Sequence, residues 1–461
     1  MKGVRMSESP DLSRRAAATL PVVVVGAGPV GLAAAAELLE RGVEPLVLER
    51  GHGAGAAVAQ WRHVRLFSQW DELTAPAARR LLDARGWRHP APDGYPTGGE
   101  WVEQYLRPLA GALGQRVRYG AEVVGVARRG RDRVVDSGRD SEPLTVHVRA
   151  RDGAQQRIIA RAVIDASGTW GSANPLGGDG LPALGERAAA DRIGYRVPDL
   201  DDAQVRARYA GRHVAVVGSG HSALTALVAL VGLAAVEPGT RISWVLRRGA
   251  VGAVFGGGDA DQLPARGALG RRARQAAEDG HVTVVPGFRT DAVEPDADGR
   301  LTLVSSGGQR IEAVDEVVVL TGFRPDLSWL SEVRLALDPV LQAPLALAPL
   351  IDPNVHSCGT VYPHGAKELE HPEPGVFLAG MKSYGRAPTF LALTGYEQVR
   401  SIAADIAGDR AAAERVELTL PETGVCGGAG LFDEPAAEVD GGCAGPATAE
   451  VLTLSAAPAS G

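Results

Sequence analysis

The sequence predicts an α/β protein with two three-layer domains, each built on a parallel sheet and one inserted into the other. Three observations predict this fold. Apolar strands alternate with Ala- and Leu-rich helical stretches, a glycine-rich turn joins strand to helix at two places, and similar strand–glycine segments flank the second unit. With 461 residues, the chain can form two or three domains that each bury a core.

The first unit begins with four consecutive valines, residues 22–25, which lead into a turn with the spacing Gly-x-Gly-x-x-Gly. An Ala-rich helix and a second apolar strand follow, and that strand ends at Glu49. In such a unit Gly26 permits the tight turn, Gly28 lets a pyrophosphate approach the backbone, and Gly31 lets the helix pack closely on the strand. The positive end of the helix faces the phosphates. The unit therefore predicts a Rossmann-like dinucleotide site in which Glu49 accepts hydrogen bonds from ribose hydroxyls.

The same pattern returns later in the chain, with Gly218 and Gly220 in the turn and Ala223 in the third glycine position. The second strand of this copy ends in Arg247 and Arg248 rather than in an acid. An acid at this place binds the 2′-hydroxyl of a ribose, whereas arginines accommodate the 2′-phosphate of NADPH. The alternative is that the two arginines are solvated surface charges. We therefore expect two cofactors, FAD in the first site and NADPH in the second.

Composition excludes several classes of partner. A formal net charge of −7 provides no general attraction to nucleic acid or to an anionic membrane. The three cysteines form neither a CxxC pair nor a disulfide framework, which suits a reducing cytoplasm. The longest apolar run, residues 223–236, is too short to span a bilayer. We expect a cytoplasmic protein whose partners are a small-molecule substrate and O2; the sequence indicates no oligomeric state.

The predicted domain boundaries follow from this order of motifs and from a Gly- and Pro-rich linker at residues 171–185. The FAD domain is expected in two parts, with the NADPH domain between them and a disordered segment at each end. The segments are 1–20 (disordered), 21–172 (FAD domain, first part), 173–324 (NADPH domain), 325–426 (FAD domain, second part) and 427–461 (disordered).

Taken in order, these motifs resemble the two-dinucleotide-binding-domain flavoproteins, and more narrowly the flavin-containing monooxygenases, over roughly residues 20–425. The matching segments are Gly26–Gly31, Tyr105–Leu106, Asp165–Gly168, Gly218–Ala223, Thr321–Pro325 and Gly375–Gly380. In such proteins the NADPH domain is inserted into the FAD domain. The predicted cofactor contacts are Gly26, Gly28, Gly31, Glu49, Trp61, Val123, Gly168, Gly218, Gly220, Ser222, Ala223, Arg247, Arg248, Gly322, Gly380 and Arg386.

The chain departs from the family pattern at one specific signature. Flavin-containing and Baeyer–Villiger monooxygenases carry FxGxxxH before the second glycine motif, but residues 181–195 contain neither the Phe nor the His. Thioredoxin reductase-like enzymes share both glycine motifs, yet they need a CxxC dithiol that this chain lacks. Their usual Gly-Asp after the last strand is Gly380-Met381 here, which favours the monooxygenase side.

The resemblance implies hydride transfer from NADPH to the flavin, followed by reaction of the reduced flavin with O2. Preserving a peroxyflavin requires a dry pocket and a hydrogen bond. The resemblance places a small polar group near the flavin edge within residues 66–70, so Ser68 and Gln69 are candidate catalytic residues, with Arg65 as a charge stabiliser. The alternative is that this segment caps a helix and packs on the surface.

A helix starting at Pro388 or Thr389 is expected to point its N-terminus at the flavin pyrimidine, in the manner of this fold. Lys382 or Arg386 would then stabilise the anion that forms on reduction. Alternatively, both cations are ordinary surface charges.

Residues 352–371 contain a cluster outside the family argument: His356, Cys358 and His364. Its spacing fits no standard zinc signature, so no metal is predicted, although a metal or metalloid, a buried cysteine and an acid/base histidine all stay open.

The leading functional hypothesis is an NADPH-dependent flavoprotein monooxygenase acting on a soft heteroatom (N, S or a metalloid) or a carbonyl. The second is an NADPH-dependent flavin reductase or oxidase that passes electrons to another acceptor. The third is a degenerate flavoprotein that acts as a redox-responsive partner of other proteins, against which both intact glycine motifs argue. The sequence does not name the substrate.

Overall fold

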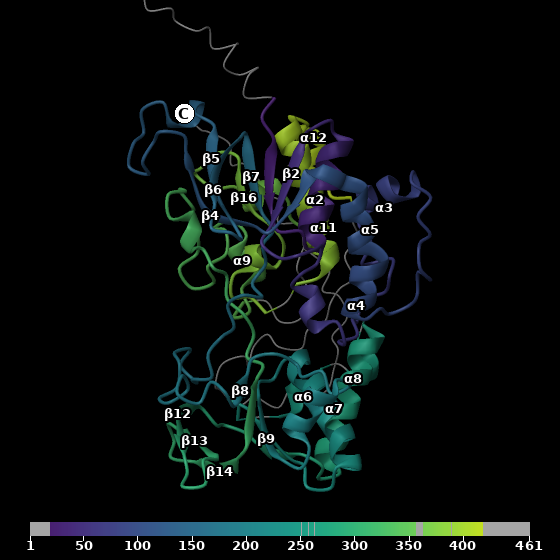
Figure 1. Ribbon diagram of the computed structural model, residues 1–461, viewed down its shortest axis with the longest axis vertical. Helices are drawn as coiled ribbons and strands as arrows, with labels where there is room; N and C mark the ends of the chain where they lie inside the picture. The colour runs from purple at the N-terminus through teal and green to yellow at the C-terminus, as the bar shows by residue number, and fades with distance from the viewer. Residues whose placement is uncertain are drawn as a thin grey trace, which may run out of the picture.

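A computed structural model describes residues 19–249, 251–256, 258–261, 263–355, 363–388 and 390–417. It forms two lobes, stacked along the long axis in Figure 1, and each is an α/β unit with a parallel sheet. The predicted fold class is therefore confirmed. Most of both predicted disordered segments, together with His356, Cys358 and the other two cysteines, lies outside the described residues.

The first lobe is built on a five-stranded sheet with the order β16-β7-β1-β2-β3, in which every neighbouring pair is parallel. The strands are β1 (Val22–Val25), β2 (Pro45–Glu49), β3 (Val117–Tyr119), β7 (Ala162–Asp165) and β16 (Val376–Leu378). The last of these comes from the part of the chain that follows the second lobe. The first lobe is therefore closed by a late segment, as an inserted domain requires.

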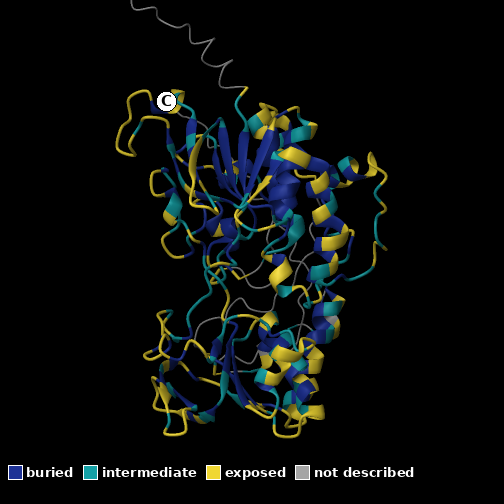
Figure 2. Cartoon of the chain, in the orientation of Figure 1, coloured by how far each residue is buried: buried dark blue, intermediate teal, exposed yellow. Residues whose placement is uncertain are grey.

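Both faces of this sheet are covered (Figures 1 and 2), which explains its uninterrupted valine run. Val22 and Val24 pack on the helical side, whereas Val23 and Val25 pack against the antiparallel sheet on the other side. The helical layer contains α2 (Pro29–Glu40), α3 (Pro76–Asp83), α5 (Arg107–Leu113) and α11 (Ala392–Ala407). The antiparallel layer contains β4 (Ala121–Arg128), β5 (Leu144–Ala150) and β6 (Gln155–Ala160).

The second lobe repeats this plan with the strand order β11-β10-β9-β15-β8, again all parallel. Val214 and Val216 pack toward the helices, and Ala215 and Val217 pack toward a second antiparallel sheet. Its strands are β8 (Ile193–Gly194), β9 (His213–Val217), β10 (Arg241–Val245), β11 (Thr283–Val285), β12 (Thr290–Pro295), β13 (Leu301–Ser305), β14 (Arg310–Val314) and β15 (Glu316–Val319). Its helices are α6 (Ala203–Tyr209), α7 (His221–Val236) and α8 (Pro264–Glu278). All these elements lie between residues 173 and 324, but the boundaries themselves stay a prediction.

Several elements differ from the sequence-based expectation. β4 and β5 form a three-stranded sheet with β6, which has no strand signal in the sequence because its first half, Gln155–Arg157, is polar and exposed. The described helix α11 begins at Ala392 rather than at Pro388 or Thr389, and Thr389 itself lies outside the described residues. The other short helices are α4 (Gly98–Trp101), α9 (Ala348–Ile351), α10 (Ala366–Leu369) and α12 (Arg410–Glu414).

The helical stretch over residues 101–113 is interrupted by a π-helical turn, residues 102–106. Pro108 has no N–H to donate, and the free carbonyl of Gln104 accepts instead from Nε1 of Trp87 at 2.9 Å. Thr97 caps α4, because Thr97 and Glu100 form a reciprocal capping box. Within the described ranges, we find no helix with the length and apolarity needed to cross a membrane.

Two antiparallel segments connect the lobes and are bonded to each other. Ala173 and Phe323 form a β-bridge, and the N–H of Asn174 donates to the carbonyl of Gly322 at 2.9 Å. The Arg324 guanidinium donates to Oδ1 of Asn174 at 2.6 Å. The chain therefore leaves and re-enters the first lobe at the same place.

The close packing of α2 on β1 predicts that a methyl group added at Gly31 lowers the free energy of unfolding. A Cβ at Gly31 would lie 2.0 Å from the carbonyl oxygen of Gly26, whereas a Cβ at the helical Gly232 would meet nothing within 4 Å. We expect Gly31→Ala to reduce the free energy of unfolding by about 1–3 kcal/mol. Gly232→Ala should instead raise it by up to about 1 kcal/mol through helix propensity. Urea denaturation followed by circular dichroism measures both; equal effects would contradict the close packing.

Candidate functional site

The first glycine turn forms an open cradle at the N-terminus of α2. Gly26 has a φ of 101°, and a Cβ there would lie 2.8 Å from the carbonyl oxygen of Ala166, so the turn needs glycine. A Cβ at Gly28 would meet nothing within 4 Å, and no side chain caps the helix. The N–H groups of the first turn of α2 thus face open space, which suits a pyrophosphate.

Glu49 fixes this cradle from the end of β2. Its carboxylate accepts hydrogen bonds from the backbone N–H of Ala27 at 2.8 Å and of Gly51 at 2.6 Å. Each oxygen keeps acceptor capacity for a ribose hydroxyl. A hollow of about 420 Å³ lies beside this end of the sheet, lined in part by His52 and Tyr119. These residues fit the adenosine diphosphate half of a flavin nucleotide.

The second glycine turn repeats the geometry at the N-terminus of α7. Gly218 has a φ of 133°, and a Cβ there would lie 2.3 Å from the carbonyl oxygen of Leu320. Gly220 is again open, with no side-chain cap on the helix, and Ser222 is exposed in the first turn. Ala223 occupies the position that Gly31 has in the first glycine motif, and it is fully buried. This cradle also fits a dinucleotide phosphate.

Two arginines lie at the edge of the second cradle. Arg247 is exposed and donates to the carbonyl of Gly178 at 3.3 Å. Arg248 is half-buried, and burial together with the adjacent charge of Arg247 lowers its pKa. In the part of the chain that the structure describes, the Arg248 guanidinium has no hydrogen-bond or ion-pair partner. An anionic group bound here would relieve this repulsion.

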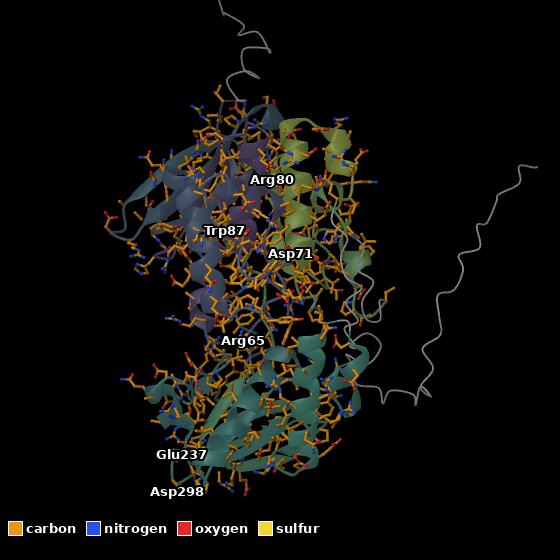
Figure 3. The ribbon with its side chains drawn as sticks, turned by 90° about the vertical axis from the view of Figure 1, so that its right-hand side faces the viewer. Arg65, Asp71, Arg80, Trp87, Glu237 and Asp298 are labelled. Carbon is orange, nitrogen blue, oxygen red and sulfur yellow. The ribbon has the colours of Figure 1, made fainter. Side chains whose placement is uncertain are left out.

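The segment with the candidate catalytic residues lies between the lobes, where Figure 3 shows Arg65. The Phe67 ring meets the His221 ring of α7 in a T-shaped contact, with centroids 5.4 Å apart, and packs on the core of the second lobe. Nδ1 of His63 lies 3.6 Å from Oδ2 of Asp199. The segment with the candidate catalytic residues therefore contacts the first turn of α7, which forms part of the second cradle.

The three candidate catalytic side chains have different surroundings. Arg65 donates to the carbonyl of Tyr95 and is largely exposed. Gln69 donates from Nε2 to the hydroxyl of Tyr95 at 3.2 Å. The half-buried Ser68 hydroxyl has no hydrogen-bond partner among the described residues. Their catalytic roles stay predictions.

The remaining predicted cofactor contacts are spread around the carboxyl edge of the first sheet and the crossover. Gly168 and Gly322 have positive φ values of 69° and 93°, each just after a strand of its own sheet. Gly380 has a φ of 70°, and its N–H donates to Oε1 of Gln398 at 2.8 Å. Trp61 is half-buried, with Gly98 directly against its ring. Val123 lies in the core between the two sheets of the first lobe.

Arg386 and Lys382 differ in environment. Arg386 is exposed and donates from Nε to Oε1 of Gln342 at 3.0 Å. Lys382 is almost fully buried, with a side chain 1% exposed, and forms an ion pair with Asp165. The interpretation of Lys382 as an ordinary surface charge is therefore wrong. Sequence reasoning also missed the pairing of Lys382 with Asp165; the rarity of lysine in the chain was the available signal.

The region that would carry FxGxxxH packs two alanines into the second lobe, whereas Leu181 and Leu184 are exposed. Gly185 has a φ of 82°, and a Cβ there would lie 2.2 Å from the carbonyl oxygen of Val293. Ala183 and Ala189, two residues before and four after this glycine, are both buried. No imidazole is available at that place to act on a nucleotide.

Of the histidine–cysteine cluster, His364 is described, whereas His356 and Cys358 lie outside the described residues. His364 is buried, with Nε2 2.8 Å from Nε2 of Gln398. Over the described ranges, no group of three or more His, Cys, Asp or Glu side chains is arranged to hold a metal ion.

Two like cradles on two like lobes, one with an acid and the other with arginines, define a flavoprotein with two dinucleotide-binding domains. Residues 20–342 match the pyridine nucleotide-disulphide oxidoreductase family, and the chain belongs to this family.

Curated relatives include two plant monooxygenases. The chain is 36% identical over 120 residues to indole-3-pyruvate monooxygenase YUCCA1 of Oryza sativa subsp. japonica. These matched residues are 26% of this chain and 27% of that enzyme. The chain is 29% identical over 208 residues to YUCCA4 of the same organism, and this match covers 44% of this chain and 43% of YUCCA4. The matches thus span less than half of these relatives. A ferredoxin–NADP reductase from Ignicoccus hospitalis is 24% identical over 68% of this chain and 80% of its own.

Solved structures of low identity share the fold. Bacillithiol disulfide reductase Bdr from Bacillus cereus has a TM-score of 0.63 at 20% identity, covering 84% of this chain and 99% of its own. A flavin-containing monooxygenase from Stenotrophomonas maltophilia has a TM-score of 0.52 at 22% identity, covering 84% and 98%. The resemblance to flavoprotein monooxygenases is confirmed. Membership of the pyridine nucleotide-disulphide oxidoreductase family implies binding of a flavin and a nicotinamide nucleotide.

The environment of His221 predicts a pH effect. Burial, with a smaller contribution from the charge of Arg266, lowers the pKa of His221 from 6.5 to about 4, so the folded protein holds it neutral. The unfolded chain binds this proton already below pH 6.5, so stability should fall as the pH decreases from 6.5 toward 4. His221→Asn should reduce this loss. Part of it should remain, because burial also lowers the pKa of His371 to about 4.

Imidazole NMR measures the titration directly. The signal that disappears in His221→Asn should not titrate above pH 5 in the parent protein. Titration near pH 6.5 would contradict the buried environment of this ring.

Proposed function

We propose that the protein is an FAD-containing, NADPH-dependent monooxygenase of a soft heteroatom (N, S or a metalloid) or a carbonyl substrate. The observation that carries the cofactor assignment is the contrast between Glu49 at the first cradle and Arg248 at the second. An acid suits a free ribose hydroxyl, and an arginine without a carboxylate partner suits the 2′-phosphate of NADPH. The relation to two indole-3-pyruvate monooxygenases supports oxygenation and favours a carbonyl-bearing substrate.

Each group of residues has a separate task in this proposal. The first turn of α2 and Glu49 hold FAD, and the first turn of α7 with Arg247 and Arg248 holds NADPH. The bound flavin supplies the hydride acceptor and the reaction with O2. Ser68 offers a hydroxyl that lacks a partner among the described residues, and it can bond to a reacting oxygen. Phe67 and His221 exclude water where the two lobes meet, which protects oxygen chemistry from side reactions.

A second function, an NADPH-dependent flavin reductase or oxidase, is favoured by one observation. The segment corresponding to FxGxxxH has alanine at both side-chain positions, and both alanines are buried in the core. The related ferredoxin–NADP reductase covers most of the chain, which agrees with a role in electron transfer. The two functions share both cofactor sites and differ only in the acceptor that reoxidises the reduced flavin. In either case we place the protein in the cytoplasm, because three cysteines provide no disulfide framework.

The cofactor assignment predicts a selective loss of affinity. Replacing Arg247 and Arg248 together by alanine should weaken NADPH binding by roughly a hundredfold or more, because charge-assisted hydrogen bonds contribute about 1.5–3 kcal/mol each. NADH affinity should change little. Arg310→Ala, in the opposite layer of the second lobe, is the matched control. Isothermal titration with both nucleotides measures the effect, and an intrinsic preference for NADH would overturn the assignment.

The oxygenation hypothesis predicts how NADPH consumption and oxygen reduction are coupled. With its substrate, the enzyme should consume NADPH without stoichiometric release of hydrogen peroxide, and reoxidation of the reduced protein by O2 should show two spectral phases in stopped-flow absorbance. Ser68→Ala should increase the peroxide released per NADPH. One-phase reoxidation with stoichiometric peroxide under all conditions would establish the reductase or oxidase instead.

A further inference from the structure

Lys382 is a buried lysine in a chain that uses arginine almost everywhere else. The chain has 48 Lys and Arg residues, and lysine occurs only at positions 2, 367 and 382. Lys367 is exposed, whereas the Lys382 side chain is 1% exposed. Lysine presents a compact point charge, whereas the arginine guanidinium spreads its charge over a planar fork. A buried point charge is therefore present at one defined place in the first lobe.

The Lys382 ammonium is enclosed by three groups. Its Nζ lies 2.6 Å from Oδ2 of Asp165. The two atoms form an ion pair whose geometry does not meet that of a hydrogen bond. The ammonium donates to Oγ of Ser167 at 3.1 Å, and it lies 4.7 Å from the centroid of the Trp329 ring. The Asp165 side chain is 0% exposed. The two opposite charges are thus removed from solvent together, so water does little to screen either of them.

This pair lies at the carboxyl edge of the first sheet, where open α/β sheets bind their ligands. Asp165 ends β7 and is in register with Val25 of β1 and Leu378 of β16. The glycine cradle begins one residue after Val25. Ser167 links the pair to this edge: it is exposed, and its hydroxyl donates to Oδ1 of Asp165 at 2.6 Å.

Other charges near the pair are weaker influences. Asp326 lies close enough for Lys382 and Arg50 to contribute to its electrostatic environment, but hydrogen bonds from Ser328 are the main reason that its pKa is lowered. Asp326 and Arg50 are both exposed, so solvent and salt screen them. Solvent and salt therefore screen these two charges more than they screen the buried pair.

We propose that Lys382 and Asp165 form a charge-balanced pair that sets the reduction potential of the flavin bound at this edge. The inference rests on flavin binding as stated in the proposed function. Two-electron reduction with uptake of one proton adds one negative charge to the flavin. The Lys382 charge favours that gain and the Asp165 charge opposes it. Both are positioning residues in this role, acting through the field rather than by contact.

The test is a double-mutant cycle on the flavin midpoint potential of the flavin-loaded protein, measured by equilibration with redox dyes. Lys382→Met should lower the potential, and Asp165→Asn should raise it. Each should change the ratio of reduced to oxidised flavin at least tenfold, which is about 30 mV for a two-electron couple. The double variant should return close to the parent value. Lys367→Met, which removes an exposed lysine, is the control and should leave the potential unchanged.

The double variant also answers the question of folding. Removing one partner of a buried ion pair is strongly destabilising, but replacing both by neutral groups is often tolerated. If Lys382→Met does not fold, Asp165→Asn should still raise the potential and the double variant should still return it. Shifts of the same sign in both single variants, or unchanged potentials, would overturn the inference alone. A parent protein that takes up no FAD would refute the proposed function as well.

Discussion

The whole arrangement depends on the close approach of backbone at the first glycine of each turn. In the first lobe, Gly26 leaves no room for a side chain beside the carbonyl of Ala166, just after β7. In the second lobe, Gly218 is in the same position relative to Leu320, just after β15. Each cradle is thus pressed against the strand end from which the chain crosses to the other lobe. Both close contacts therefore lie where a glycine turn meets the segment that leads to the other lobe.

Much of this could be predicted from the sequence because its signals are local. Valine runs, glycine spacing and the residue at the end of the second strand are read directly, and the fold that they predict is confirmed. The strand β6 escaped prediction because its first residues are polar. In the π-helical turn before Pro108, the Gln104 carbonyl accepts a hydrogen bond from Trp87, 17 residues away in the sequence. Local pattern carries no information about such partners.

In the candidate site, too, local motifs could be predicted from the sequence, whereas long-range contacts could not. Glu49 was assigned to a ribose, and the structure adds that its carboxylate also holds the turn together through Ala27 and Gly51. The pairing of Asp165 with Lys382 joins residues 217 positions apart (382 minus 165), so no spacing rule reveals it. The contact of Phe67 with His221 likewise arises only when two separately folded lobes meet. Long-range pairings of this kind define the chemistry that the glycine motifs leave open.

The bonded crossover has a consequence for how such a chain is assembled over evolutionary time. Because Ala173 and Phe323 are bridged, the two ends of the second lobe lie side by side. A short turn could close the first lobe across that gap, and the intervening segment would leave as one cassette without cutting either core. Recombination at this crossover could exchange the second lobe while the first lobe keeps its own core. The second lobe is therefore a module that is covalently joined to the first lobe only through the two segments around Ala173 and Phe323.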